Sequence, residues 1–152
     1  MSNFYIEAEG LNELMARVEK VASQEAVAQT TKSFLKECGK ITQARAKDLA
    51  PRSEDHQASG VKHKGQIRLV PPLHMDDAIP LSGVKGTNKA NMYIVVGWQK
   101  DDNSPYVYGK FIEYGTSKMP PRPFMENALQ QTQGQFDEIG QMKYEELAKG
   151  ID

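Results

Sequence analysis

Cysteine is nearly absent from this sequence of 152 residues, since Cys38 is the only one, and this excludes a disulfide within the chain. An excess of charge is also absent, because 19 Lys and Arg residues balance 20 Asp and Glu residues and the formal net charge is −1. The chain therefore has no global electrostatic attraction to DNA or to anionic lipid. These totals indicate an ordinary folded protein of a reducing compartment.

Long apolar runs are missing as well. No run approaches the roughly 20 residues that a transmembrane helix requires, and the opening "MSNFYIEAEG" lacks the basic and apolar regions of a signal peptide. No repeat is evident, and the glycines form neither a phosphate-binding loop nor a dinucleotide fingerprint. We expect a single domain over residues 1–152 that works in solution or in an assembly built there.

Two amphipathic patterns dominate what is present. Apolar residues recur at three- and four-residue steps from Leu11 to Ala50, and Pro51 ends this helical pattern. A continuous helix of that length would measure on the order of 60 Å, so it either breaks near Ser23 to Glu25 or projects beyond the body. A second pattern, from Met125 to Leu147, predicts a C-terminal helix.

Short β-like segments surround the helical patterns. They cover residues 3–10, 67–70, 80–86 and 91–99. In the last segment Ile94 and Val96 point to one face and Tyr93 and Val95 to the other, so that this strand requires cover on both sides. Residues 106–115 fit either a strand or a helix, and the polar residues 51–66 predict a flexible loop.

The stretch "FIEYGTSKMPPRPFM", from Phe111 to Met125, predicts a rigid elbow before the last helix. Its prolines at positions 120, 121 and 123 each fix φ near −65° and remove a backbone donor. Pro123 can begin the last helix, where a missing N–H costs nothing. Gly115 permits a sharp turn out of the preceding element. The pattern is typical of a joint that holds a helix at a fixed angle.

The same stretch, extended to "FIEYGTSKMPPRPFMENA", resembles the signature of a family of phage neck proteins, which are also described as tail-completion or minor tail components of long-tailed phages. "EGLNELMARVEKV" and "LHMDDAI" followed by "YIVVGW" give weaker matches. Asn127 departs from the pattern, since many relatives have a proline there. The matching residues are Glu113, Tyr114, Gly115, Thr116, Ser117, Lys118, Met119, Pro120, Pro123, Phe124 and Ala128.

The resemblance implies a fold and a role. The fold is α+β, with a long N-terminal helix and a C-terminal helix packed on a small, mainly antiparallel β-sheet. The role is that of a structural, non-enzymatic subunit at the head–tail junction that forms a ring with copies of itself and contacts other neck or tail proteins. Such a protein is found in the host bacterial cytoplasm during assembly and then in the virion. The resemblance implies no cofactor.

Within the elbow, we expect two contact segments for subunits or partners, the turn Glu113–Lys118 and the arm Met119–Phe124. Tyr114 and Phe124 are the expected packing anchors. Glu113, Lys118 and Arg122 are candidates for ion pairs between subunits, although exposed pairs contribute only about 0–1 kcal/mol each.

A basic cluster leaves a second hypothesis open. Arg52, Lys62, Lys64 and Arg68 are either solvated loop residues or line a channel and meet DNA phosphates without reading sequence. The alternative function is therefore a small nucleic-acid-binding regulator that uses residues 62–68. No sequence pattern of a reading helix accompanies the cluster.

Candidates for catalysis or metal binding are weak. His56 and His63 lie seven positions apart, which is not the spacing of a helical metal pair. Asp76 and Asp77 are adjacent, and adjacent helical residues point in different directions, so we expect cap or surface roles. Cys38 lies on the apolar stripe of the first helix, which favours packing over nucleophilic chemistry. A small hydrolase is the least favoured hypothesis.

Overall fold

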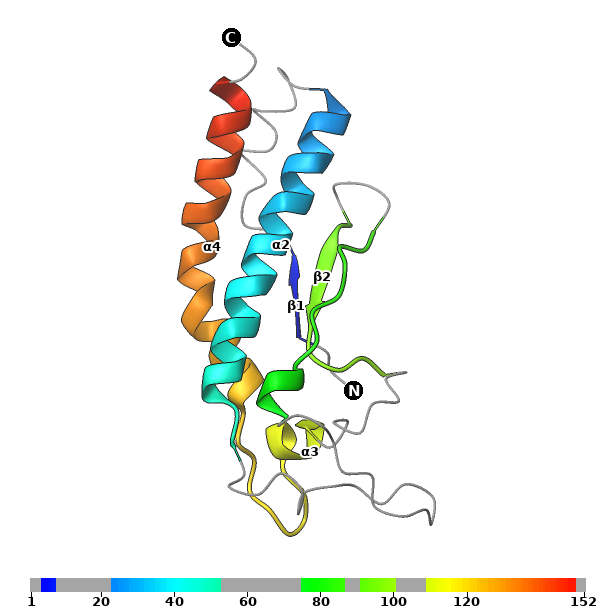
Figure 1. Cartoon of the computed structure of the whole chain (residues 1–152), viewed down its shortest axis with the longest axis vertical. Helices are drawn as coiled ribbons and strands as arrows, with labels where there is room; N and C mark the ends of the chain where they lie inside the picture. Colours follow the sequence, from blue (N-terminus) through cyan, green and yellow to red (C-terminus); the bar gives the residue numbers. More distant parts are fainter. Residues whose placement is uncertain (1–3, 8–22, 53–74, 87–90, 101–108, 150–152) are drawn as a thin grey trace.

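The computed structural model describes residues 4–7, 23–52, 75–86, 91–100 and 109–149. Two helices of 26 residues dominate, and α2 lies between α4 and β2 (Figure 1). The protein is thus mostly helical in its described part. The elements are β1 (Phe4–Glu7), α2 (Gln24–Leu49), the 3-10 turn η3 (Asp76–Ala78), β2 (Tyr93–Val96), α3 (Gly109–Tyr114) and α4 (Phe124–Lys149).

Both ends of α2 follow from its sequence. Ser23 is extended (φ −66°, ψ 150°), and its hydroxyl accepts a hydrogen bond from the Ala26 N–H at 3.2 Å, as an N-cap does. α2 therefore begins after Ser23, within the region where we expected that the helical pattern could break. At the other end Ala50 is extended because a proline follows it, and α2 ends at Leu49. The helix is about 39 Å long.

Two buried hydroxyl pairs join α2 to α4, which run in opposite directions. Thr31 Oγ1 donates its hydrogen to the Val27 carbonyl oxygen at 2.9 Å, so the Tyr144 hydroxyl, 2.7 Å away, must donate to Thr31. In the same way Thr132 donates within its own helix, and Thr42 donates to Thr132 Oγ1 at 3.0 Å. All four hydroxyl-bearing residues are buried. These pairs fix how the two helices align.

The sheet is small. β1 pairs antiparallel with β2, with Phe4 opposite Val96 and Glu7 opposite Tyr93. The expected strand at 80–86 lies along the other edge of β2, but it is joined there by isolated antiparallel bridges, Leu81 to Val96 and Lys85 to Tyr93. Because no further regular strand forms among the described residues, the β component is smaller than the sequence led us to expect.

β2 is buried on both faces, as its pattern predicted. Ile94 and Val96 belong to the core, and Val95 on the opposite face is only 4% exposed. On the core side, a Cβ on Gly39 of α2 would lie 2.8 Å from Leu81 Cδ1 and 2.9 Å from Ile94 Cδ1, so the glycine permits this close approach. Since the chain itself buries Val95, the strand does not require a neighbouring subunit to cover it.

One further expectation is settled by the remaining described segments. The ambiguous stretch 106–115 forms the helix α3 over its described part, Gly109–Tyr114. The expected strand at 67–70 and nearly all of the expected loop at 51–66 lie outside the described residues. Neither α2 nor α4 is apolar enough to cross a membrane, and the same holds for every other helix described.

The Tyr144–Thr31 pair gives a first prediction. We expect Tyr144→Phe to lower the free energy of unfolding by about 1 kcal/mol, because it removes one buried hydrogen bond without removing the ring. Urea denaturation of Tyr144→Phe, Thr31→Val and the double variant measures the coupling. The cost of the double variant should be smaller than the two single costs together. Strictly additive costs would contradict a direct bond between these side chains.

Candidate functional site

The joint begins where α3 ends. Gly115 follows α3 with φ +74°, a left-handed conformation that confirms the expected sharp turn. A Cβ at this position would lie 2.7 Å from the Pro121 nitrogen and 2.8 Å from the Met119 carbonyl oxygen. Glycine is therefore required both by the backbone angle and by the close return of the chain.

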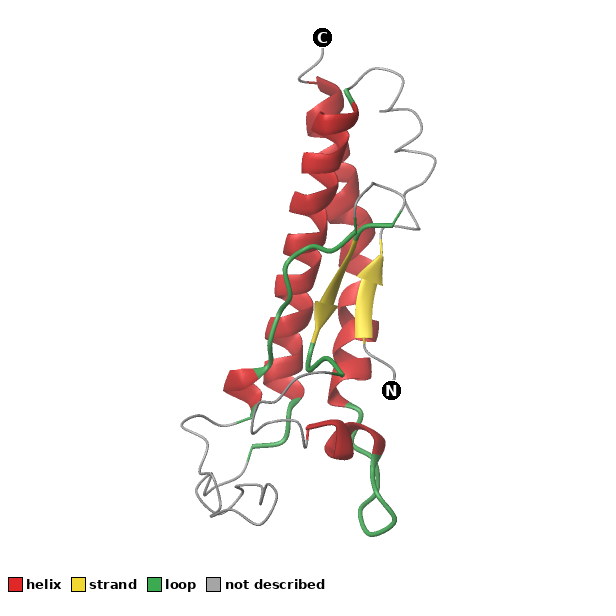
Figure 2. Cartoon of the chain, turned by 90° about the vertical axis from the view of Figure 1, so that its right-hand side faces the viewer, coloured by secondary structure: helices red, strands yellow, loops and turns green. Residues whose placement is uncertain are grey.

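A small backbone hairpin follows. The Thr116 N–H donates to the Met119 carbonyl at 2.8 Å, and the Met119 N–H donates back at 3.3 Å. The Lys118 N–H also donates to Thr116 Oγ1 at 3.2 Å. The Arg122 N–H then donates to the Ile112 carbonyl at 2.7 Å, and this bond holds the segment after the hairpin against α3. The hairpin protrudes beyond the ends of the long helices (Figure 2).

Glu113 connects α3 to the start of α4. Its Oε2 accepts a hydrogen bond from the Met125 N–H at 2.9 Å, and its Oε1 accepts one from the Glu126 N–H at 3.0 Å. Since α4 begins at Phe124, these are the second and third amides of the helix, which an N-cap side chain normally satisfies. The residue before the helix is Pro123, which has no side-chain acceptor. Glu113 supplies the cap from another element.

The environment of this carboxyl group sets its acidity. Glu113 is 4% exposed, and burial raises its pKa above the ordinary value of 4.5, although the two backbone hydrogen bonds act in the opposite direction. The positive end of the α4 dipole favours a negative charge at the same place. Glu113 thus lies inside its own chain and is not placed to form an ion pair with another subunit.

The outer side of the joint is accessible. Phe111 is 49% and Tyr114 48% exposed, and they lie on one side of α3 because they are three residues apart. Thr116, Ser117 and Lys118 at the hairpin tip are exposed too. We call these five residues the joint surface. Of the two expected anchors, Phe124 is buried in the core, whereas Tyr114 is half exposed.

Arg52, a candidate for contact with DNA, is held by acidic neighbours. Its Nη1 lies 2.5 Å from Asp76 Oδ2, and its Nη2 lies 3.4 Å from Asp77 Oδ2. The two aspartates therefore share one guanidinium, although adjacent positions led us to expect that they would point apart. The other candidates, Lys62, Lys64 and Arg68, lie outside the described residues.

The reactive candidates take no part in a described site. Cys38 is fully buried, and burial raises the pKa of its thiol to about 12, so it is a protonated packing residue at neutral pH. Among the residues that the structure describes, no group of three or more His, Cys, Asp and Glu side chains can hold a metal ion. His56, His63 and His74 lie outside those residues.

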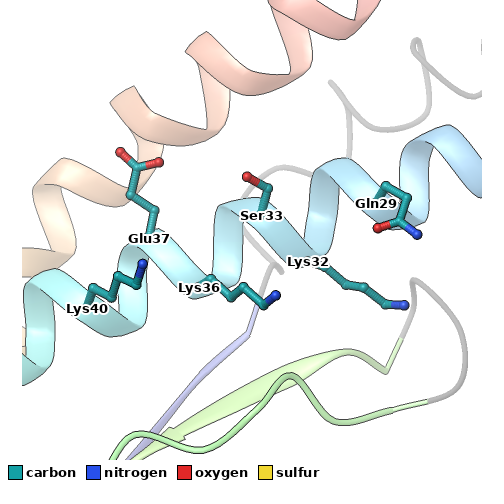
Figure 3. Close-up of a pocket in the computed structure, with 6 residues that line it drawn as sticks. All are labelled: Gln29, Lys32, Ser33, Lys36, Glu37 and Lys40. Carbon is teal, nitrogen blue, oxygen red and sulfur yellow. The ribbon is translucent and has the colours of Figure 1, made fainter.

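One surface was missed from the sequence. Three lysines on α2, Lys32, Lys36 and Lys40, border a hollow (Figure 3), whose lining consists of Gln29, Lys32, Ser33, Lys36, Glu37 and Lys40. Their spacing of four residues puts them on one side of a helix, and this spacing is visible in the sequence. The spacing alone does not reveal a site, because lysines on one side of a helix usually indicate only a solvated face.

The comparison with protein families identifies the class as a tail component of bacteriophages. The chain belongs to the HK97-gp10-like family, described as "Bacteriophage HK97-gp10, putative tail-component", whose sequence model matches residues 12–115. This confirms the resemblance to phage neck and tail proteins. The match ends at Gly115, so it includes Glu113 and Tyr114 but not the hairpin tip or the prolines. Comparisons with curated proteins and with solved structures found no match.

The cap predicts a specific loss of stability. We expect Glu113→Ala to lower the free energy of unfolding by about 2–3 kcal/mol, because it removes two charge-assisted bonds and leaves two helix amides without their acceptor. Glu113→Gln keeps an oxygen acceptor and should cost about 1 kcal/mol. Urea denaturation measures both. Equal costs for the two variants would contradict the expectation that an amide oxygen at position 113 replaces the carboxylate as the acceptor.

The raised pKa of Glu113 predicts a pH dependence. The folded chain holds the Glu113 proton at pH values where the unfolded chain, with its ordinary pKa of 4.5, has lost it. The folded state therefore binds more protons over this interval, and the contribution of Glu113 to stability falls as pH rises through the folded pKa. The free energy of unfolding of the wild type relative to Glu113→Gln should decrease from pH 4.5 upwards. A relative stability that increases over this range would contradict the direction of the shift.

Proposed function

We propose that this protein is a structural virion assembly protein that acts at the head–tail junction, in the neck or in completing the tail. Membership of a phage tail-component family supports this role. The observation that carries the proposal is the joint, in which the Glu113 cap ties α3 and the following hairpin to α4 while α3 presents two half-exposed aromatic rings at one end of the molecule. In this role the protein works by contact and catalyses no reaction.

The joint surface is suited to binding a protein partner. Aromatic side chains such as Phe111 and Tyr114 are enriched in interfaces because they bury a large area at a small cost in conformational entropy. The surrounding backbone is already ordered by hydrogen bonds, so little ordering remains to be done on binding. The partner that we propose is another neck or tail protein, which binds Phe111, Tyr114 and the hairpin tip.

We also propose that copies of the chain form a ring within the virion. A tail is built around an axis, and a subunit that repeats one contact through a closing rotation generates a ring. In this proposal the protein is present in the host cytoplasm during assembly and afterwards at the junction of head and tail. Weak contact of Lys62, Lys64 and Arg68 with packaged DNA remains a secondary proposal.

A regulator that binds nucleic acid is less well supported. The formal net charge is −1, and the described basic residue of the cluster, Arg52, is already paired with two aspartates. No described feature favours sequence reading by this chain. The observation that would favour this alternative is salt-sensitive binding of duplex DNA that is lost when Lys62, Lys64 and Arg68 are replaced together.

The joint surface predicts a defect in assembly without a defect in folding. We expect the double variant Phe111→Ser, Tyr114→Ser to stay folded and to lower the free energy of unfolding by about 2 kcal/mol, since both rings are already half exposed. The yield of infectious particles from a phage that encodes this variant should fall at least about tenfold. Interface aromatics often contribute more than 1.4 kcal/mol to the free energy of binding, which corresponds to a factor of ten in affinity. Electron microscopy should show separate heads and tails.

The matched control is Gln133→Ser, an exposed position on α4 away from the joint, which should leave particle yield unchanged. Normal yield from the double variant, with the protein still incorporated, would contradict a role of the joint surface in contact. Normal particles from a phage that lacks the gene altogether would contradict the proposed function itself.

A further inference from the structure

The outer side of α2 carries a row of positive charges. Lys32, Lys36 and Lys40 follow at intervals of four residues, which keeps them on one side of the helix, and each is exposed or half-buried. We call them the lysine face. None of them has an ion-pair partner among the described residues.

The lysine face points away from α4. Figure 3 shows Lys32 and Lys36 extending from α2 on the side opposite to α4, whereas Glu37 points toward α4. There Glu37 Oε2 forms an ion pair with Lys143 Nζ of α4 at a distance of 2.8 Å. The acidic residue in the middle of this basic stretch is therefore engaged by the neighbouring helix and does not neutralise the lysines.

The outer side of α4 has the opposite charge. Glu138 and Glu145 lie seven residues apart, which puts them on one side of the helix. Both are exposed, and neither has an ion-pair partner in the described part of the chain. We call them the acidic face. Met142 lies between them, four residues after Glu138 and three before Glu145, and is 64% exposed, more than any other large apolar side chain described.

The two faces match in length but do not meet within one molecule. Lys32 to Lys40 span about 12 Å of helix, and Glu138 to Glu145 span about 11 Å. Lys32 and Lys36 are directed away from α4, so the acidic face of the same chain is out of their reach. A second copy of the chain, however, can bring its acidic face to them. Such a contact joins two different surfaces and repeats from copy to copy.

We propose that the lysine face of each copy docks against the acidic face of α4 of the next copy. The proposal rests on the ring assembly put forward above and specifies the contact that closes it. Each exposed ion pair is weak, so the charges set the orientation and the salt dependence of the contact, while Met142 supplies apolar area. Duplex DNA would satisfy the lysine face alone and would leave the acidic face and Met142 without a role.

Charge reversal on each face tests this contact. One variant carries Lys32→Glu, Lys36→Glu and Lys40→Glu, and the other carries Glu138→Lys and Glu145→Lys. We expect each variant to stay monomeric in sedimentation at concentrations where the wild type assembles, because like charges then face each other. An equimolar mixture should assemble again, since every contact between the two variants pairs opposite charges.

The matched control replaces the same lysines by arginine, which preserves the charge and should preserve assembly. Should either variant unfold, the single changes Lys36→Glu and Glu138→Lys, at exposed positions, replace it. Each should weaken self-association by more than about tenfold, and their mixture should recover it. Raising the salt concentration should weaken assembly of the wild type.

The outcomes separate the contact from the proposed function. Assembly of both reversed variants on their own, like the wild type, overturns the contact but leaves the tail role intact. Failure of the mixture to assemble overturns the contact as well. Duplex DNA binding that only the lysine-face variant loses, with normal assembly of the acidic-face variant, assigns the lysines to DNA instead. If the wild-type protein stays monomeric, alone and with tail components, both the ring assembly and the contact that closes it are overturned.

Discussion

The bond between the Glu113 carboxylate and the first turn of α4 is the interaction on which the arrangement of the joint depends. α4 starts directly after Pro123, which offers no side-chain acceptor, so its Met125 and Glu126 amides would be left unsatisfied without Glu113. A carboxylate twelve residues earlier in the chain fills this gap and thereby ties α3 to α4. The prolines stiffen the path between them, but the carboxylate determines where that path begins and ends, and so where the hairpin tip projects.

The second constraint is the alignment of α2 with α4. The Thr31–Tyr144 and Thr42–Thr132 pairs lie about three helical turns apart on both helices. Together they fix the position of α2 along α4 and the rotation of each helix about its own axis. A hydroxyl pair in a buried interface is satisfied in only one register, because any shift would leave polar atoms without partners. The sides of the helices that face outward are thereby fixed as well.

Much of this architecture follows from local sequence rules, but the central contact does not. Periodicity predicts both long helices, and Ser23 and Pro51 locate the limits of α2 because caps and prolines act within a few residues. The pairing of Glu113 with the amides of α4 depends on how the chain folds back, and no local rule contains that information. For the same reason Tyr114 and Phe124, which look alike in the motif, differ in burial, since only Phe124 faces the core. The lysine spacing was readable, but whether those lysines are paired was not.

Near-neutral composition conceals a division of charge between the two long helices. A rotation of α4 by one residue, about 100°, would turn part of its acidic face toward α2 and bring Met142 or a glutamate into the buried interface. The cap and the hydroxyl pairs oppose such a rotation, because each depends on one helix orientation. The residues that stabilise the single molecule therefore also determine which side chains lie on its surface. An assembly that repeats weak contacts many times requires this, because a small error in orientation would recur at every copy.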